Sequence, residues 1–190
     1  LMGTHHIQNA LAAIAVSHEL GMPLATIKKG LSQFKGIGRR LEILFKDRHR
    51  KLFVIDDYGH HPVEIKATLG AIREAWPHCH LVVIFQPHRY SRTKDLFDDF
   101  VKSFNVANHL IVTKIYAASE SPIQGITAKK IANSIRRKSL KVTYQESFED
   151  IIQEVKGQIK DNTVIVTLGA GDIVKVGKLL SKMLKGKSLS

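Results

Sequence analysis

The sequence predicts an α/β fold with a mostly parallel sheet flanked by helices. Short apolar runs rich in β-forming residues alternate with longer runs that carry apolar residues at helical spacing. Such alternation is typical of parallel strands joined by right-handed helical crossovers. With 190 residues, of which 44% are hydrophobic, the chain is also long enough to bury a substantial core.

The amino-terminal part of the chain is predicted to be helical. One helix is expected to include 9–16 and to end at Gly21, and a second is expected over 23–34. The stretch Gly36-Ile37-Gly38 interrupts this pattern and is a candidate domain boundary. We therefore divide the chain into residues 1–36 and residues 37–190.

The remainder of the chain begins with a predicted hairpin, with strands at 41–45 and 51–55 joined by a charged turn. Helices and strands then alternate. The expected helices are 63–76, 93–104, 127–137, 147–159 and 172–185, and the expected strands are 80–85, 109–113, 140–144 and 163–168.

Residues 56–62, Asp-Asp-Tyr-Gly-His-His-Pro, follow a predicted buried strand and precede a helix that Pro62 is suited to begin. Open α/β sheets bind their ligands at this carboxyl end of their strands. Without further information, the His-His pair near two Asp residues would suggest a metal site, as in certain metal-dependent phosphoesterases. The additional Asp and His ligands that such a cluster needs are not found at convincing spacing.

Residues 86–93, Gln-Pro-His-Arg-Tyr-Ser-Arg-Thr, follow the next predicted strand. Arg89 and Arg92 are three residues apart, so on a tight turn or first helical turn they are expected to point the same way. Two adjacent guanidinium groups suit a carboxylate or a phosphate. The alternative is a pair of surface ion pairs with Asp95 or Asp98.

The composition restricts the possible partners. A net charge of +12 favours anionic partners, either nucleic acid or small polyanions such as nucleotides. The basic clusters lack the interleaved aromatic residues that single-strand binders use. A single cysteine excludes a disulfide framework and fits a cytoplasmic location, and neither a membrane-spanning run nor a signal peptide is visible.

Together, the two polar stretches resemble the Mur ligase family of peptidoglycan synthesis. Three further segments agree with this family in the same order along the chain: Gly3 to Ala15, Gly38 to Glu42, and Ile115 to Ala118 with Pro122-Ile123. The resemblance implies that residues 1–36 correspond to the end of a central ATP-binding domain. It also implies that the rest forms the Rossmann-like C-terminal domain.

The resemblance further implies an ATP-dependent, ADP-forming ligase that joins L-alanine to the carboxylate of UDP-N-acetylmuramate through an acyl phosphate. Mg²⁺ would assist, held mostly by residues upstream, and no metal ligand is assigned in this chain. The phosphate loop and the UDP-binding domain are not found in the sequence, so we expect a C-terminal fragment that is inactive without its amino-terminal and central domains. Neither nucleic acid nor a membrane is expected as a partner.

Site residues are carried over from the same resemblance. His60 is the candidate catalytic residue. The other candidates are residues expected to contact the amino-acid substrate, His60 included, and residues expected to contact ATP. The amino-acid contacts are Tyr58, His60, His88, Arg89 and Arg92, and the ATP contacts are His5, Asn9, Arg40 and Asp57. The roles of His6, which replaces an Asn of the family pattern, of His61 and of the turn Gly169-Ala170-Gly171 stay open.

Three alternatives remain at this point. A sister ligase that recycles a murein tripeptide shares much of the pattern, but there we expect Phe-Ala rather than Tyr58-Gly59 before the His-His pair. More remote alternatives are a metal-dependent phosphoesterase and a basic module that binds nucleic acid.

Overall fold

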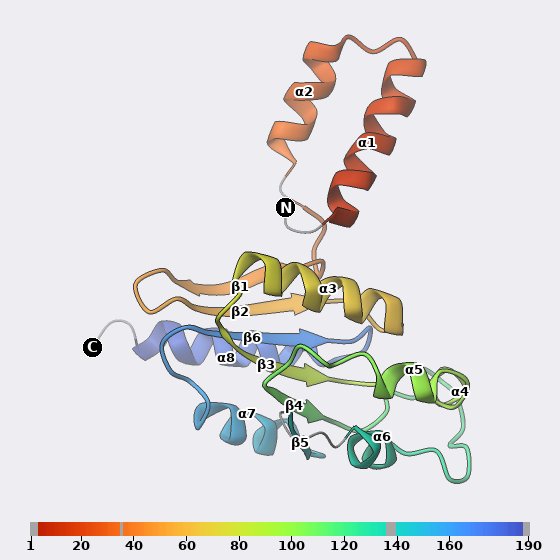
Figure 1. Ribbon diagram of the computed structural model, residues 1–190, viewed down its shortest axis with the longest axis vertical. Helices are drawn as coiled ribbons and strands as arrows, with labels where there is room; N and C mark the ends of the chain where they lie inside the picture. Colours follow the sequence, from red (N-terminus) through yellow and green to blue (C-terminus); the bar gives the residue numbers. More distant parts are fainter. Residues whose placement is uncertain (1–3, 35, 136–139, 188–190) are drawn as a thin grey trace.

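The structure is a computed structural model that describes residues 4–34, 36–135 and 140–187. A six-stranded sheet of order β1-β2-β6-β3-β4-β5 forms its centre (Figure 1). The strands are β1 Glu42–Asp47, β2 Leu52–Asp57, β3 His80–Phe85, β4 His109–Val112, β5 Lys141–Tyr144 and β6 Thr163–Leu168. Only β1 runs antiparallel to its neighbour, so the predicted α/β fold with a mostly parallel sheet is confirmed.

Helices cover both faces of the sheet. Their bounds are α3 Pro62–Ala75, α4 Tyr90–Asp95, α5 Phe97–Val101, α6 Ala128–Ser134, α7 Phe148–Lys156 and α8 Val174–Lys187. Successive residues of a strand point to opposite faces, and β6 shows the result. Val164 and Val166 pack in the core beneath α3, α5 and α6, whereas Ile165 packs in the core beneath α7 and α8.

One predicted helix is wrong. The segment 93–104 forms two short helices, because Leu96 has φ −112° and ψ 23° and interrupts the helical path between α4 and α5. The bend allows Leu96, Phe97 and Phe100 to pack on the same core. The first of the two helices also begins three residues earlier than expected, at Tyr90.

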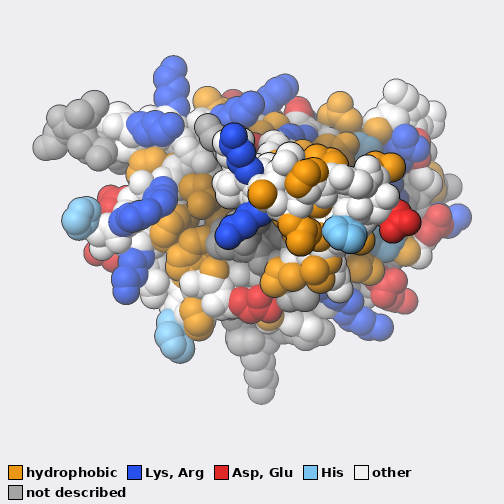
Figure 2. Space-filling view, turned by 90° about the horizontal axis from the view of Figure 1, so that it is seen from above, with side chains coloured by type: hydrophobic (Ala, Val, Ile, Leu, Met, Phe, Trp, Pro, Cys, Tyr) orange, Lys and Arg blue, Asp and Glu red, His pale blue; other side chains and the backbone are white. Residues whose placement is uncertain are grey.

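Two further helices, α1 Thr4–Glu19 and α2 Leu24–Gln33, form a hairpin that projects away from the sheet (Figure 1). Several of its large apolar side chains are exposed, including Ile7 at 62% and Leu11 at 59%. Figure 2 views the molecule from the side of this hairpin and shows hydrophobic side chains at the surface, with Lys and Arg side chains spread around them. The division between residues 1–36 and 37–190 stays a prediction.

Candidate functional site at the carboxyl edge of the sheet

Three turns meet where β2, β6 and β3 end, and we call this region the carboxyl edge (residues 58–61, 86–89 and 169–172). Because these strands are parallel and adjacent, their ends lie side by side. The turn after β6 carries no side chain at Gly169 or Gly171. A side chain at Gly169, where φ is +146°, would lie 2.8 Å from the carbonyl oxygen of Gln86. One at Gly171 would collide with the Gln86 side chain and the Tyr116 ring. The two glycines therefore allow close packing of the turns after β6 and β3.

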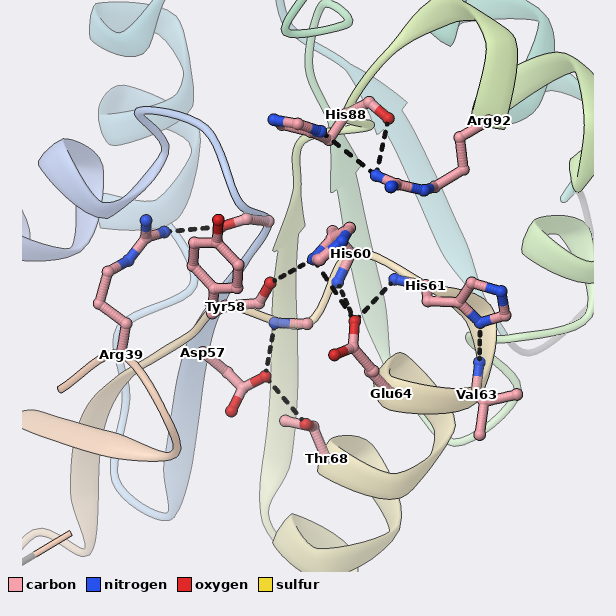
Figure 3. A network of polar contacts seen from close by, with 12 residues as sticks. Arg39, Asp57, Tyr58, His60, His61, Val63, Glu64, Thr68, His88 and Arg92 are labelled. Atoms are coloured by element: carbon pink, nitrogen blue, oxygen red, sulfur yellow. Dashed lines mark hydrogen bonds and ion pairs between the residues drawn. The ribbon is translucent and has the colours of Figure 1, made fainter. Parts of the chain in front are cut away.

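Asp57, a predicted nucleotide contact, is buried beneath this edge. Its Oδ1 accepts hydrogen bonds from Gly59 N at 2.8 Å and Thr68 Oγ1 at 3.0 Å (Figure 3). Its Oδ2 accepts one from Leu41 N at 2.9 Å. These contacts give Asp57 a structural role, because both oxygens hold other segments in place. Its contact with a nucleotide stays a prediction.

Glu64, which the sequence reasoning missed, is the centre of the polar network around His60. Its Oε2 accepts hydrogen bonds from the backbone N–H groups of His60 and His61, each at 3.0 Å (Figure 3). Partial burial favours the neutral form of Glu64, but the backbone hydrogen bonds from His60 and His61, together with the side chains of His60 and Arg40, lower the pKa of its carboxyl overall. The available signal was the spacing: a Glu three residues after a helix N-cap forms a capping box.

His61, whose role was left open, is that N-cap residue. Its Nδ1 accepts a hydrogen bond from Val63 N at 3.4 Å, and its backbone conformation is extended, as at most helix starts. The side chain of His61 therefore begins α3, and the neighbouring His60 lies in the turn that faces β3.

Imidazole, phenol and guanidinium groups line the space between the turns. The rings of His60 and His88 lie 5.6 Å apart, and Tyr58 packs edge-on against His60 at 5.3 Å. Arg92 approaches His88 from α4, with its Nη1 3.2 Å from the His88 Nδ1. Burial, reinforced by the positive charges nearby, lowers the pKa of His88. At neutral pH the site therefore combines neutral His88 with cationic Arg92, an arrangement that attracts an anion.

Arg89 and Arg92 both belong to the start of α4, as its N-cap and its third helical residue, and that their side chains point the same way stays a prediction. Arg92 lies within α4, whereas Arg89 precedes that helix with φ +71°, a conformation that non-glycine residues rarely adopt. The half-exposed Arg89 has an ion pair with Glu120 at 3.8 Å rather than with Asp95 or Asp98. Glu120 also accepts hydrogen bonds from Ser91 N at 3.0 Å and Ser91 Oγ at 2.6 Å, and so caps α4 from another loop.

Arg39 fixes the chain that leads into the sheet against the carboxyl edge. Its Nε donates to Asp56 Oδ2 at 3.0 Å, one Nη donates to the Gly169 carbonyl at 2.6 Å, and its guanidinium lies 4.9 Å from the centre of the Tyr58 ring. Burial raises the pKa of Asp56, although bonds from Thr167 and Arg39 oppose this effect. Arg39 was left without a role from the sequence, where nothing indicated its partners.

A cavity lies between α1, α2 and the segment that leads to β1. It measures about 350 Å³ and has an apolar wall, and it is lined by Asn9, Ala10, Ala13, Leu31, Phe34, Ile37 and Arg40. Two of the four residues predicted to contact ATP, Asn9 and Arg40, are thus brought together, while Asp57 is not among them. His5 falls within α1, but its side chain lies outside the described part of the structure, as does that of His6.

The chain resembles known proteins in both sequence and structure. A sequence profile described as "Mur ligase, glutamate ligase domain" matches residues 39–171. The chain belongs to the Mur ligase family. The family resemblance inferred from the two polar stretches is therefore confirmed.

Within the Mur ligase family, the chain is similar to ligases that act on UDP-N-acetylmuramate and alanine by name. The chain is 48% identical over 183 residues to the UDP-N-acetylmuramate–L-alanine ligase of Trichlorobacter lovleyi, covering 96% of this chain and 40% of that protein. The crystal structure of a UDP-N-acetylmuramate–alanine ligase from Thermotoga maritima superposes with a TM-score of 0.82 at 31% identity, covering 98% of this chain and 39% of that one. A murein peptide ligase from Psychrobacter arcticus superposes with a TM-score of 0.65 at 25% identity, over 97% of this chain and 38% of that one.

The Mur ligase chain spans about 40% of the length of the curated relatives it matches. Among the described residues, no helix is long and apolar enough to cross a membrane, and no group of three or more His, Cys, Asp or Glu residues is placed to hold a metal ion.

Proposed function

We propose that this chain is part of an ATP-dependent ligase that adds L-alanine to UDP-N-acetylmuramate. The observation that carries the proposal is the clustering of Tyr58, His60, His88 and Arg92 at the carboxyl edge. It is supported by the names of the relatives that are 44% to 49% identical to the chain. The chain would act in the cytoplasm, a location that fits its single cysteine.

In the proposed reaction, the γ-phosphoryl group of ATP moves to the carboxylate of UDP-N-acetylmuramate and forms an acyl phosphate and ADP. The amine of L-alanine then attacks the acyl carbon and the C–N bond forms. The C–O bond to the phosphate breaks, and inorganic phosphate leaves with the electron pair of that bond. The attacking amine must lose a proton, and His60 is the group proposed to accept it. Arg92, with Arg89 nearby, would bind the carboxylate of alanine and so hold the amine in line for attack.

The nucleotide would occupy the cavity lined by Asn9 and Arg40. Its apolar wall suits a purine ring, and the guanidinium of Arg40 suits a phosphate. Mg²⁺ is expected from the family, but the described residues offer no group of ligands for it. No step is therefore assigned to a metal held by this chain.

The test is phosphate release by the full-length protein that contains this chain, with ATP, magnesium and UDP-N-acetylmuramate. L-alanine and the murein tripeptide would be compared as acceptors. Turnover with L-alanine is expected, and turnover with tripeptide alone would transfer the chain to the recycling ligases. The 190-residue chain assayed alone is expected to be inactive. Detectable turnover by it would contradict the proposal that catalysis also needs the amino-terminal and central domains.

A further inference from the structure

Glu64 contacts both of the proposed ligand regions at once. Its Oε1 accepts a hydrogen bond from Arg40 Nη1 at 3.2 Å, and Arg40 lines the cavity between α1 and α2. Its Oε2 receives the backbone N–H groups of His60 and His61 and lies 3.4 Å from the Nδ1 of His60. One carboxylate therefore joins the nucleotide side of the molecule to the amino-acid side.

The two oxygens of Glu64 do different things. Oε2 completes the capping box at the start of α3, which requires only backbone donors. Oε1 takes no part in that cap and is bonded to Arg40. The ion pair between Glu64 and Arg40 is therefore separable from the helix cap, and it calls for an explanation other than helix stability.

The surroundings of His60 fix which of its nitrogens is available. Nδ1 lies 3.0 Å from the carbonyl oxygen of Tyr58 and 3.4 Å from Oε2 of Glu64, and both of these are acceptors. Nδ1 therefore carries the proton of neutral imidazole, and Nε2 keeps the lone pair. A base that accepts a proton from an amine needs such a lone pair directed at the open side of the site.

The ion pair between Glu64 and Arg40 is open to competition. The side chains of Arg40 and Glu64 are 39% and 32% exposed, so an incoming anion can reach the guanidinium. A phosphate that binds Arg40 would weaken its bond to Oε1 and leave more of the negative charge of Glu64 on the His60 side. A change at the nucleotide cavity thus reaches His60 through one side chain.

We propose that Glu64 is a positioning residue that couples nucleotide binding at Arg40 to the orientation of His60. The inference rests on the proposed ligase function, since it assumes that the two regions bind the two ligands. Coupling of this kind is reciprocal, so occupancy of the amino-acid region must affect nucleotide affinity by the same factor.

The test uses Glu64→Gln in the full-length protein. Gln keeps one carbonyl oxygen for the helix cap, but it removes the charge and places an NH₂ group beside either Arg40 or the cap. Glu74→Gln is the matched control, because Glu74 is an exposed residue of the same helix. The expected result for Glu64→Gln is a fall of about 10- to 100-fold in kcat/KM for L-alanine. A lowered KM for ATP should accompany it, because Arg40 loses the carboxylate that competes with phosphate, and the melting temperature should stay close to that of the control.

A double-mutant cycle then separates positioning from a purely structural role. Arg40→Lys and His60→Gln should be non-additive when Glu64 is present and additive in the Glu64→Gln background. Kinetics of Glu64→Gln that match those of Glu74→Gln would overturn the inference. So would a loss of activity that only follows a loss of stability, or coupling between Arg40 and His60 that persists without Glu64. Absence of turnover by the unmodified protein would instead reject the proposed function on which the inference rests.

Discussion

The two ends of the same parallel sheet both combine histidine with glutamate, yet they differ in exposure. At the carboxyl edge, the side chains of His60 and Glu64 are 20% and 32% exposed. At the opposite end, which we call the amino edge (His80, His109, Lys141, Glu154 and Gln158), His109 and Glu154 are 1% and 13% exposed. The residue types are alike, but the His-Glu pair at the carboxyl edge is the more exposed of the two.

Bonding differs in the same way. Glu154 at the amino edge accepts hydrogen bonds from Thr143 Oγ1 at 2.9 Å and Gln145 Nε2 at 2.8 Å, and it lies 3.0 Å from His109 Nε2. The hydrogen-bonding capacity of the Glu154 carboxylate is thus used within the protein. At the carboxyl edge, the side chains of His60 and Arg89 are 20% and 50% exposed. A His-Glu pair thus indicates a functional site only when its position in the fold leaves it accessible.

The largest expected effect on catalytic activity comes from a change at the carboxyl edge. Arg92→Ala should lower kcat/KM for L-alanine by about 30-fold or more, because the loss of one charged partner of a carboxylate typically costs 2 kcal/mol or more. Steady-state phosphate release measures it. Lys94→Ala, an exposed residue of the same helix, is the control. Equal losses in the two variants would mean that Arg92 makes no special contact.

The second effect is on stability at the amino edge. Glu154→Ala removes the partner of His109, Thr143 and Gln145, and should lower the free energy of unfolding by about 3 kcal/mol. Glu64→Ala at the more exposed carboxyl edge should cost about 1 kcal/mol, the value typical of a lost helix cap. Denaturant unfolding of both variants, with exposed Gln153→Ala as the control for α7, checks this. Equal losses in the free energy of unfolding at the two edges would contradict the predicted difference between them.

The position of the carboxyl edge was predictable from the sequence, whereas the polar cluster of the amino edge was not. The alternation of strands and helices placed residues 56–62 and 86–93 at strand ends, where parallel sheets bind ligands. The bond between Arg39 and Gly169, 130 residues apart, depended on the strand order, which places β6 between β2 and β3. Sequence spacing could not give that order. The positive φ of Arg89 was equally hidden, because it depends on bonds to Tyr116 and on the cap that Glu120 supplies from a distant loop.

A third effect concerns the thin turn of the carboxyl edge. Gly171→Ala should lower the free energy of unfolding by about 2 kcal/mol, because its methyl group would displace the Gln86 side chain or the Tyr116 ring. Tyr116 stacks on His88 at 5.5 Å, so the variant should also reduce kcat/KM. In contrast, Gly30→Ala in α2 meets no neighbour within 4 Å and should be slightly stabilising. Thermal unfolding of both variants compares them, and a neutral Gly171→Ala would contradict the close packing.

The smallest expected effect is the pH dependence of stability from the amino edge. Burial lowers the pKa of His109 below 6.5, aided by Lys141 and His80, although Glu154 opposes this shift. Among the described residues Nδ1 of His109 has no hydrogen-bond partner, so protonation would add a buried N–H without an acceptor. Below pH 6.5 the unfolded state then binds more protons than the folded state. Stability should therefore fall as the pH drops, by at most about 1.4 kcal/mol per pH unit for one histidine.

His109→Gln tests this origin of the pH dependence, because it removes the titrating group but keeps an amide that can bond Glu154. The slope of unfolding free energy against pH between about 6.5 and 5 should become shallower in this variant. His88 at the carboxyl edge also has a lowered pKa. His88→Gln should flatten the slope less, since His88 lies nearer to solvent and can be hydrated when charged. A larger change from His88→Gln than from His109→Gln would show that the carboxyl edge, rather than the closed amino edge, dominates the response to acid.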